Sequence, residues 1–169
     1  MHNDLIRPRS AHRRPDARRG ARGFTITELL VSLAIAAVLA TVAVPSFNGI
    51  IASQRARTFA SDMYVAIAKT RAAAISLNQN VTLQPNAGGW ANGWQILDVN
   101  NNVLDNHAAA TAVTVGAAAA VTYRASGRLP AGAAVPVFLI STTSGTMVNH
   151  QCVSVDLGGR PYMKAAAAC

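Results

Sequence analysis

Glu28 is the side chain whose position most invites a chemical role, because it is a lone carboxylate at the start of a long apolar run. Every residue of Leu29–Val44 is apolar except Ser32 and Thr41. Pro45 follows the run. A carboxylate in lipid costs about 2.5–3.5 kcal/mol on insertion scales and usually has a partner. We therefore expect Glu28 either to reach the membrane–water boundary or to keep its charge for pairing inside an assembly of helices.

The apolar run is long enough to cross a membrane when it is counted from Phe24. An α-helix rises about 1.5 Å per residue, so residues 29–44 extend about 24 Å. A hydrocarbon core is about 30 Å thick and takes roughly 17–25 residues. We therefore expect residues 24–50 to form the transmembrane part of a helix, and residues 51–169 to form an exported globular domain.

Residues 1–23 are basic: they hold seven of the fifteen lysines and arginines and two of the seven acids. This segment carries +5, and the remaining 146 residues, one domain by length, carry +3. The positive-inside rule keeps the basic end cytoplasmic and exports the rest, giving a single-pass membrane protein. A basic tail that binds nucleic acid is the competing interpretation.

The order of these parts differs from that of a secretory signal, in which the small-residue cleavage site follows the apolar core. Here Gly23 lies before the apolar run, so a cut at Gly23 would remove the charges and keep the helix. Residues 23–30 read GFTITELL. This segment, with Pro45 behind it, resembles the type IV pilin and type II pseudopilin superfamily.

The resemblance implies three properties of the first residues. A prepilin peptidase would cut between Gly23 and Phe24 and so remove the leader, residues 1–23. The new amine of Phe24 would then be N-methylated. Glu28 would pair with an amine in the helical fibre that the chain forms with other pilins.

Beyond Pro45 the spacing of apolar residues predicts that the helix continues with one buried face and ends near residues 78–80. The face comprises Ala52, Ala56, Phe59, Met63, Ala66, Thr70, Ala73 and Leu77, widened by Ala60, Tyr64 and Ile67. Short β-prone segments follow, separated by turn residues. They are 81–84, 94–99, 111–115, 121–124, 136–141, 152–156 and 160–164. A long helix followed by a run of strands predicts an α+β fold, the helix packing on an antiparallel sheet.

Two cysteines, Cys152 and Cys169, would form a disulfide in an exported domain. His150 near Cys152 lacks the spacing of a metal site, so we expect no metal and no cofactor. Histidines 107 and 150 have no Ser or Cys partner motif, and there is no GxSxG, HExxH or Walker-type segment. We therefore expect no enzyme activity.

The second half resembles the GspH/FimT family of minor pilins and pseudopilins. The resemblance rests on residues 122–128 (TYRASGR), 136–140 (PVFLI) and 152–160 (CVSVDLGGR). It implies a non-catalytic subunit of a type IV pilus that helps to initiate fibre assembly. A minor pseudopilin of type II secretion is an alternative that the sequence leaves open.

A further alternative is a DNA-binding subunit at the pilus tip, used in natural transformation. Some members of the family bind DNA through a C-terminal Gly-Arg-x-Arg motif. Here Gly159 and Arg160 match that motif, but Tyr162 stands in place of the second arginine, with Lys164 two residues further on. Arg160, Lys164, Arg124 and Arg128 could contact phosphates without reading bases, and Tyr162 could stack on a base.

Overall fold

The computed structural model describes residues 23–116 and 118–169, apart from the side chains of Val42 and Val44–Ser46. The chain forms two compact units, Met1–Leu39 and Ala40–Cys169. The helix α1 (Ile26–Ser76) contributes to both units. The predicted leader lies outside the described residues except for Gly23. In the part of the chain that the structure describes, no helix has both the length and the apolar character of a membrane span.

In the second unit, α1 buries one face, as the spacing of its apolar residues predicts. The buried positions are Ala52, Ala56, Phe59, Ala60, Met63, Ala66, Ile67, Thr70 and Ala74. Tyr64 and Leu77 were predicted on this face but are exposed, by 38% and 47%. Tyr64 lies about 100° around the helix from Met63. Leu77 follows the last helical residue, Ser76, so the helix ends slightly earlier than predicted.

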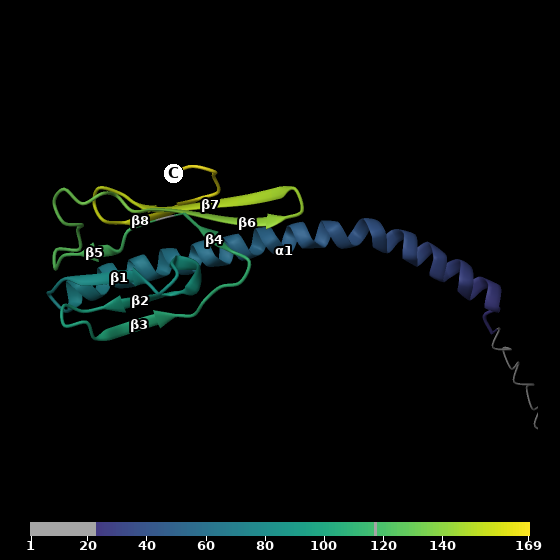
Figure 1. Cartoon of the computed structure of the whole chain (residues 1–169), viewed down its shortest axis with the longest axis horizontal. Coiled ribbons are helices and arrows are strands. Elements are labelled where there is room, and N and C mark those ends of the chain that lie inside the picture. Colours follow the sequence, from purple (N-terminus) through teal and green to yellow (C-terminus); the bar gives the residue numbers. More distant parts are fainter. Residues whose placement is uncertain (1–22, 117) are drawn as a thin grey trace, which may run out of the picture. The chain divides into compact units, whose positions relative to one another are not determined.

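Two four-stranded antiparallel sheets complete the unit, which confirms the predicted α+β class (Figure 1). The first sheet has the order β3-β2-β1-β5 and consists of β1 (Val81–Pro85), β2 (Trp94–Leu97), β3 (Val103–His107) and β5 (Val121–Tyr123). The second has the order β4-β6-β7-β8 and consists of β4 (Thr114–Val115), β6 (Val137–Ser144), β7 (Met147–Val155) and β8 (Pro161–Lys164). A short 3₁₀ helix, η1 (Trp90–Asn92), precedes β2. The sequence did not predict β3, and β4 is shorter than the predicted strand 111–115.

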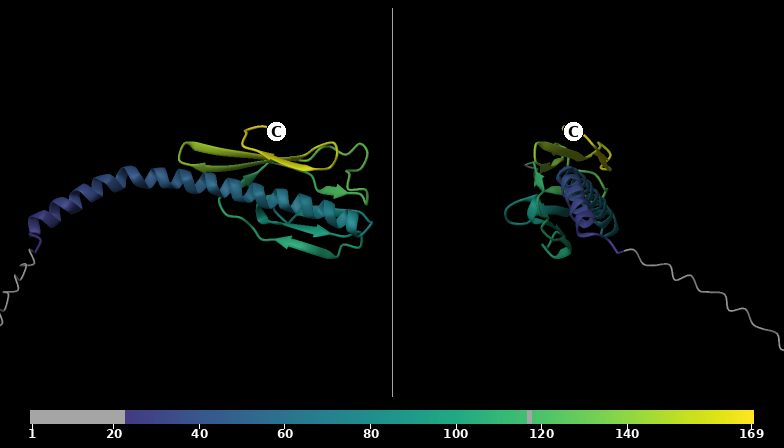
Figure 2. Two further views of the ribbon diagram at one scale, coloured as in Figure 1. Left: turned by 180° about the vertical axis from the view of Figure 1, so that it is seen from behind. Right: turned by 90° about the vertical axis from the view of Figure 1, so that its right-hand side faces the viewer.

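Both sheets lie along α1, and the end-on view shows the helix against the two of them (Figure 2). The core between them contains edge-to-face aromatic pairs: Phe59 with Trp94, whose ring centres are 5.4 Å apart, and Trp90 with Phe138, 4.8 Å apart. The buried Thr142 hydroxyl of β6 donates a hydrogen bond to the Ala52 carbonyl oxygen of α1, at 2.8 Å. The second sheet is therefore fixed to the helix by packing and by a buried polar contact.

Candidate functional site

The helix α1 begins with a side-chain cap. The Thr25 hydroxyl oxygen accepts a hydrogen bond from the Glu28 backbone N–H at 3.2 Å. Such a contact satisfies one of the N–H groups that the first helical turn leaves unpaired. A threonine followed three residues later by a glutamate is a known capping pattern, so the sequence TITE at 25–28 already signals this start.

Gly23, Phe24 and the Glu28 side chain are all exposed, and Phe24 has 79% of its surface accessible. The Gly23–Phe24 peptide bond precedes the helix, which begins at Ile26. Among the described residues, the Glu28 carboxylate has no hydrogen-bond or ion-pair partner. The predicted cleavage and pairing positions are therefore accessible to other molecules.

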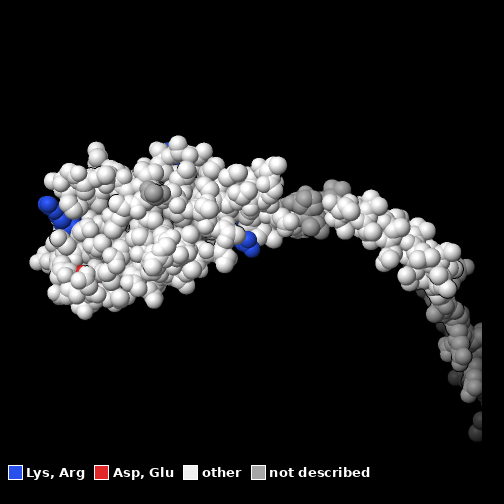
Figure 3. Space-filling view, in the orientation of Figure 1, with Lys and Arg blue, Asp and Glu red and all other residues white. Residues whose placement is uncertain are grey.

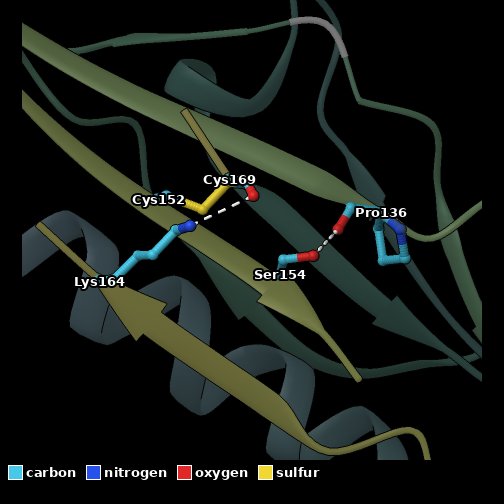
Figure 4. The surroundings of a disulfide bond; sticks show 5 residues. All are labelled: Pro136, Cys152, Ser154, Lys164 and Cys169. Carbon is cyan, nitrogen blue, oxygen red and sulfur yellow. Dashed lines mark hydrogen bonds between the residues drawn. A yellow bond between two sulfur atoms is a disulfide. The ribbon is translucent and has the colours of Figure 1, made fainter. Parts of the chain in front are cut away.

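Cys152 and Cys169 form the predicted disulfide, with Cα atoms 5.5 Å apart (Figure 4). Cys152 is fully buried on β7, on the face of the sheet that points away from the core residue Val153. The Lys164 ammonium group on β8 donates a hydrogen bond to the Cys169 main-chain oxygen at 3.2 Å. The last residues of the chain are thereby held against the outer face of the second sheet.

Two tight turns from different sheets meet at one end of the unit. In the first turn, after β5, the Arg124 N–H donates to the Arg128 carbonyl oxygen at 2.9 Å. In the second, between β7 and β8, the Asp156 N–H donates to the Arg160 carbonyl oxygen at 2.9 Å. Gly159 of the second turn has a φ of 82°, and a Cβ added there would stand 2.5 Å from the Gly127 carbonyl oxygen. The close approach of the turns therefore needs a glycine at this position.

Two further contacts tie this junction to the rest of the fold. The Arg71 Nε of α1 donates to the Gly127 carbonyl oxygen at 2.9 Å. The Tyr123 hydroxyl donates to the Gly159 carbonyl oxygen at 2.9 Å, and burial raises the pKa of Tyr123 to about 12. The tyrosine therefore stays neutral and continues to donate over the physiological pH range.

We call the surface formed by the two turns and Arg71 the turn junction. Its charged residues are Arg71, Arg124, Arg128, Arg160 and Asp156, whose sum of +3 equals the formal charge of residues 24–169. Within the described residues, the side chains of Arg124, Arg128 and Arg160 form no hydrogen bond or ion pair. Figure 3 shows a face with few charged groups, and one positively charged group projects from the end of the globular unit.

The structure separates Lys164 from this cluster. Arg160 belongs to the turn junction, whereas Lys164 is at the far end of β8, opposite Cys152. Four residues of strand span about 13 Å. Tyr162 is 40% exposed and pairs with Ser154 across the sheet. Three of the four predicted cations therefore lie together, and the fourth interacts with Cys169 instead.

Two further pairs of charged or titratable side chains are in contact away from the turn junction. Lys69 of α1 contacts Asp105 of β3 at 2.9 Å, and this hydrogen bond lowers the pKa of Asp105. Asp62 lies 3.5 Å from the His107 Nε2, and the His107 ring stacks on Trp94. Across residues 23–116 and 118–169, no three His, Cys, Asp or Glu residues are grouped so that they could hold a metal ion.

Comparison with protein families gives two matches. The model described as type II transport protein GspH matches residues 60–159, which is more than half of the chain. The model described as the prokaryotic N-terminal methylation motif matches residues 18–44. No curated protein matches the chain significantly.

Among solved structures, the chain resembles the type IV minor pilin FimU of Pseudomonas aeruginosa strain PAO1 in two crystal forms. The P65 form has a TM-score of 0.53 at 20% identity, and the match covers 67% of this chain and 98% of that one. The P21 form has a TM-score of 0.54 at 21% identity, and the match covers 67% of this chain and 93% of that one. At these identities the likeness establishes a common fold.

Proposed function

The chain belongs to the GspH family and carries the N-terminal methylation motif, and from these two facts we propose that it is a minor pilin. In this role it is a non-catalytic subunit that enters a type IV pilus and helps to initiate fibre assembly. Its partners are a prepilin peptidase, which cuts between Gly23 and Phe24, and the other pilins of the fibre. The protein matches the FimU fold, and FimU is described as a minor pilin.

The observation that supports this role most strongly is the apolar surface of α1 before residue 40. Ile26 is 82% exposed, and the large apolar side chains from Leu29 to Leu39 are 57% to 68% exposed: Leu29, Leu30, Val31, Leu33, Ile35, Val38 and Leu39. A surface of this kind needs a cover. We propose that the inner membrane covers it first, with the basic N-terminus cytoplasmic and the domain periplasmic, and that neighbouring pilin helices cover it in the fibre.

Deletion of the gene in its own organism tests this proposal. We expect few or no surface pili in the deletion strain, with pili restored by the intact chain, and we expect the mature chain in sheared pilus fractions. Normal pili together with a loss of type II protein secretion would assign the chain to a pseudopilus instead. Normal pili and normal secretion would reject both roles.

The turn junction favours a second candidate function, DNA binding at the pilus tip. Three arginines whose side chains have no partner among the described residues surround the two turns. A pocket of about 360 Å³ beside them is lined by Arg124, Ser126, Arg128, Asp156 and apolar residues. Arginines that meet phosphates give binding that is independent of sequence and falls with salt. The opposite charge of Asp156 at the same place reduces the attraction.

This candidate function is tested by titrating the leaderless chain in detergent with duplex DNA at two salt concentrations. Three phosphate contacts predict a log–log salt slope of about −2.7. Replacing Arg124, Arg128 and Arg160 together by Gln should lower both the affinity and the slope. Lys164→Gln is the matched control and should have the smaller effect, because Lys164 interacts with Cys169. No binding by the wild-type chain at low salt would exclude the DNA role and leave the pilin role intact.

A further inference from the structure

The end of the globular unit opposite the turn junction is built from three segments, which we call the hairpin end: residues 47–58 of α1, 108–112 and 143–149. The β6–β7 connection lies beside α1 (Figure 1), and a Cβ added at Gly49 would stand 2.7 Å from the Met147 methyl group. Two grooves follow α1 here. One lies between α1 and residues 110–113, and the other lies between α1 and Met147 and Asn149.

The hairpin end exposes large apolar side chains from two of its segments. Phe47, Ile50 and Ile51 of α1 are 62%, 65% and 47% exposed, and Met147 and Val148 of β7 are 55% and 50% exposed. Ile50 and Met147 line the same groove. Phe47 and Ile51 lie about 160° around α1 from Gly49, the residue that faces Met147, so they extend the apolar surface around the helix. A clustered apolar surface of this kind marks contact with a protein or with a membrane.

The charges of the hairpin end favour a membrane. Its three segments contain Arg55 and Arg57 and no Asp or Glu. Asp62, about one helical turn beyond them, also lines the groove beside Arg55 and lies 3.5 Å from the His107 Nε2. Both arginines are exposed, and neither side chain has a hydrogen-bond or ion-pair partner among the described residues. Apolar side chains combined with unpaired cations and no acids suit the interface of a bilayer with anionic headgroups.

The sequence also brings this surface close to lipid. Residue 47 comes three positions after Val44, the last residue of the apolar run that begins at Leu29. If the run is held in a bilayer, the hairpin end begins within about one helical turn of the membrane boundary. The turn junction lies at the other end of the unit, where α1 finishes.

We propose that the hairpin end docks the globular unit on an anionic lipid surface while the chain waits in the membrane for assembly. In this state Phe47, Ile50, Met147 and Val148 enter the interface, and Arg55 and Arg57 contact lipid phosphates. Entry into a fibre would require this contact to be released. The proposal rests on the membrane anchoring proposed above.

The test places a tryptophan at each end of the unit. The leaderless chain is reconstituted in vesicles of brominated phosphatidylcholine with phosphatidylglycerol, in which bromine quenches tryptophan that enters the lipid. The native Trp90 and Trp94 are buried, with 4% and 2% exposed, and give a constant background. We expect quenching of the emission that Met147→Trp adds, and none of the emission that Leu157→Trp adds at the turn junction.

A second arm tests the charges. An arginine near an anionic surface shifts docking by on the order of fivefold. Arg55→Gln with Arg57→Gln should therefore weaken the quenching of Met147→Trp markedly in anionic vesicles and little in vesicles of phosphatidylcholine alone. Arg124→Gln with Arg128→Gln is the matched control and should leave the quenching unchanged.

The results separate this proposal from the anchoring on which it rests. A chain that does not float with the vesicles overturns both. A chain that floats with them, but shows no quenching at Met147→Trp or equal quenching at both ends, overturns the docking proposal alone. If replacing Arg55 and Arg57 leaves the quenching of Met147→Trp unchanged, the lipid surface is not recognised through its negative charge, and that assignment is wrong.

Discussion

The Tyr123 hydroxyl donates a 2.9 Å hydrogen bond to the Gly159 carbonyl oxygen and so joins the two sheets of the domain. Tyr123 ends β5 of the first sheet, and Gly159 lies in the turn that leads to β8 of the second. Tyr123 is also among the largest fully buried side chains. This buried side chain therefore helps to hold together the two turns that carry Arg124, Arg128 and Arg160.

Tyr123→Phe should destabilise the domain, because it leaves the Gly159 carbonyl without its donor. The loss of one buried hydrogen bond predicts a decrease of about 1–2 kcal/mol in the free energy of unfolding at pH 7, measured with urea. Tyr162→Phe is the matched control, since Tyr162 is partly exposed and its hydroxyl has no partner in the described chain. Equal stability of Tyr123→Phe and wild type would contradict a supporting role for this bond.

Tyr123 also predicts that the free energy of unfolding of the domain depends on pH in the alkaline range. The pKa of Tyr123 rises from its usual 10 to about 12 in the folded protein because the side chain is buried. A group whose pKa is raised by folding stabilises the protein fully below its unfolded pKa and loses this effect as pH rises through the folded pKa. The difference in unfolding free energy between wild type and Tyr123→Phe should therefore narrow between about pH 10 and pH 12. If the difference between wild type and Tyr123→Phe stays constant over this interval, the pKa of Tyr123 is not raised by folding.

The long helix and its buried face could be predicted because they depend on spacing within one segment. Ala56, Phe59, Met63 and Ala66 recur at three and four residues, and all are buried. The methylation motif could be recognised for the same reason, since all its residues are consecutive. The helix cap at Thr25 also has a signal within one segment, the threonine followed three residues later by Glu28.

Other features depend on contacts between distant segments. Strand β3 has no alternation of apolar and polar residues, and Asp105 and His107 fix it by contacting Lys69, Asp62 and Trp94. The turn junction joins segments about thirty residues apart, from different sheets. No pattern within either segment shows that the two turns meet, or that Lys164 lies away from them.

Loss of the disulfide should destabilise the domain without unfolding its core. The bond joins residues separated by 17 positions. Closing a loop of this size is worth about 3 kcal/mol in the chain-entropy model. Cys169→Ser should lower the urea midpoint accordingly, and Cys152→Ser should lower it at least as far, because Cys152 is fully buried. Adding reductant should lower the urea midpoint of wild type and leave that of Cys169→Ser unchanged. If reductant also lowers the midpoint of Cys169→Ser, the effect on wild type is not due to the disulfide alone.

Cleavage after Gly23 can be tested independently of folding. A Cβ added at Gly23 meets no atom within 4 Å in the described structure, so a substitution there does not disturb the fold. Wild-type protein extracted from membranes should have the mass of a chain that begins at Phe24 and carries one methyl group. Gly23→Val should retain the leader, whereas Gly20→Val should be processed normally. Another N-terminus, or processing of Gly23→Val, would reject this site.

Glu28→Ala should block entry into the fibre while leaving the helix start intact. The cap uses the Glu28 backbone N–H, which alanine retains, and within the described residues the carboxylate has no partner of its own. Glu28→Gln, which keeps the shape and removes the charge, should fail equally if the carboxylate pairs with an amine.

Thr25→Ala is the matched control for Glu28, because it removes the cap, at a cost of about 1 kcal/mol, and keeps the carboxylate. We expect Thr25→Ala to appear in sheared fibres and both Glu28 variants to remain in the membrane fraction at normal abundance. Fibre entry by Glu28→Gln would show that the charge is dispensable. Loss of Thr25→Ala from fibres together with both Glu28 variants would indicate that the geometry of the helix start, and not the carboxylate, controls assembly.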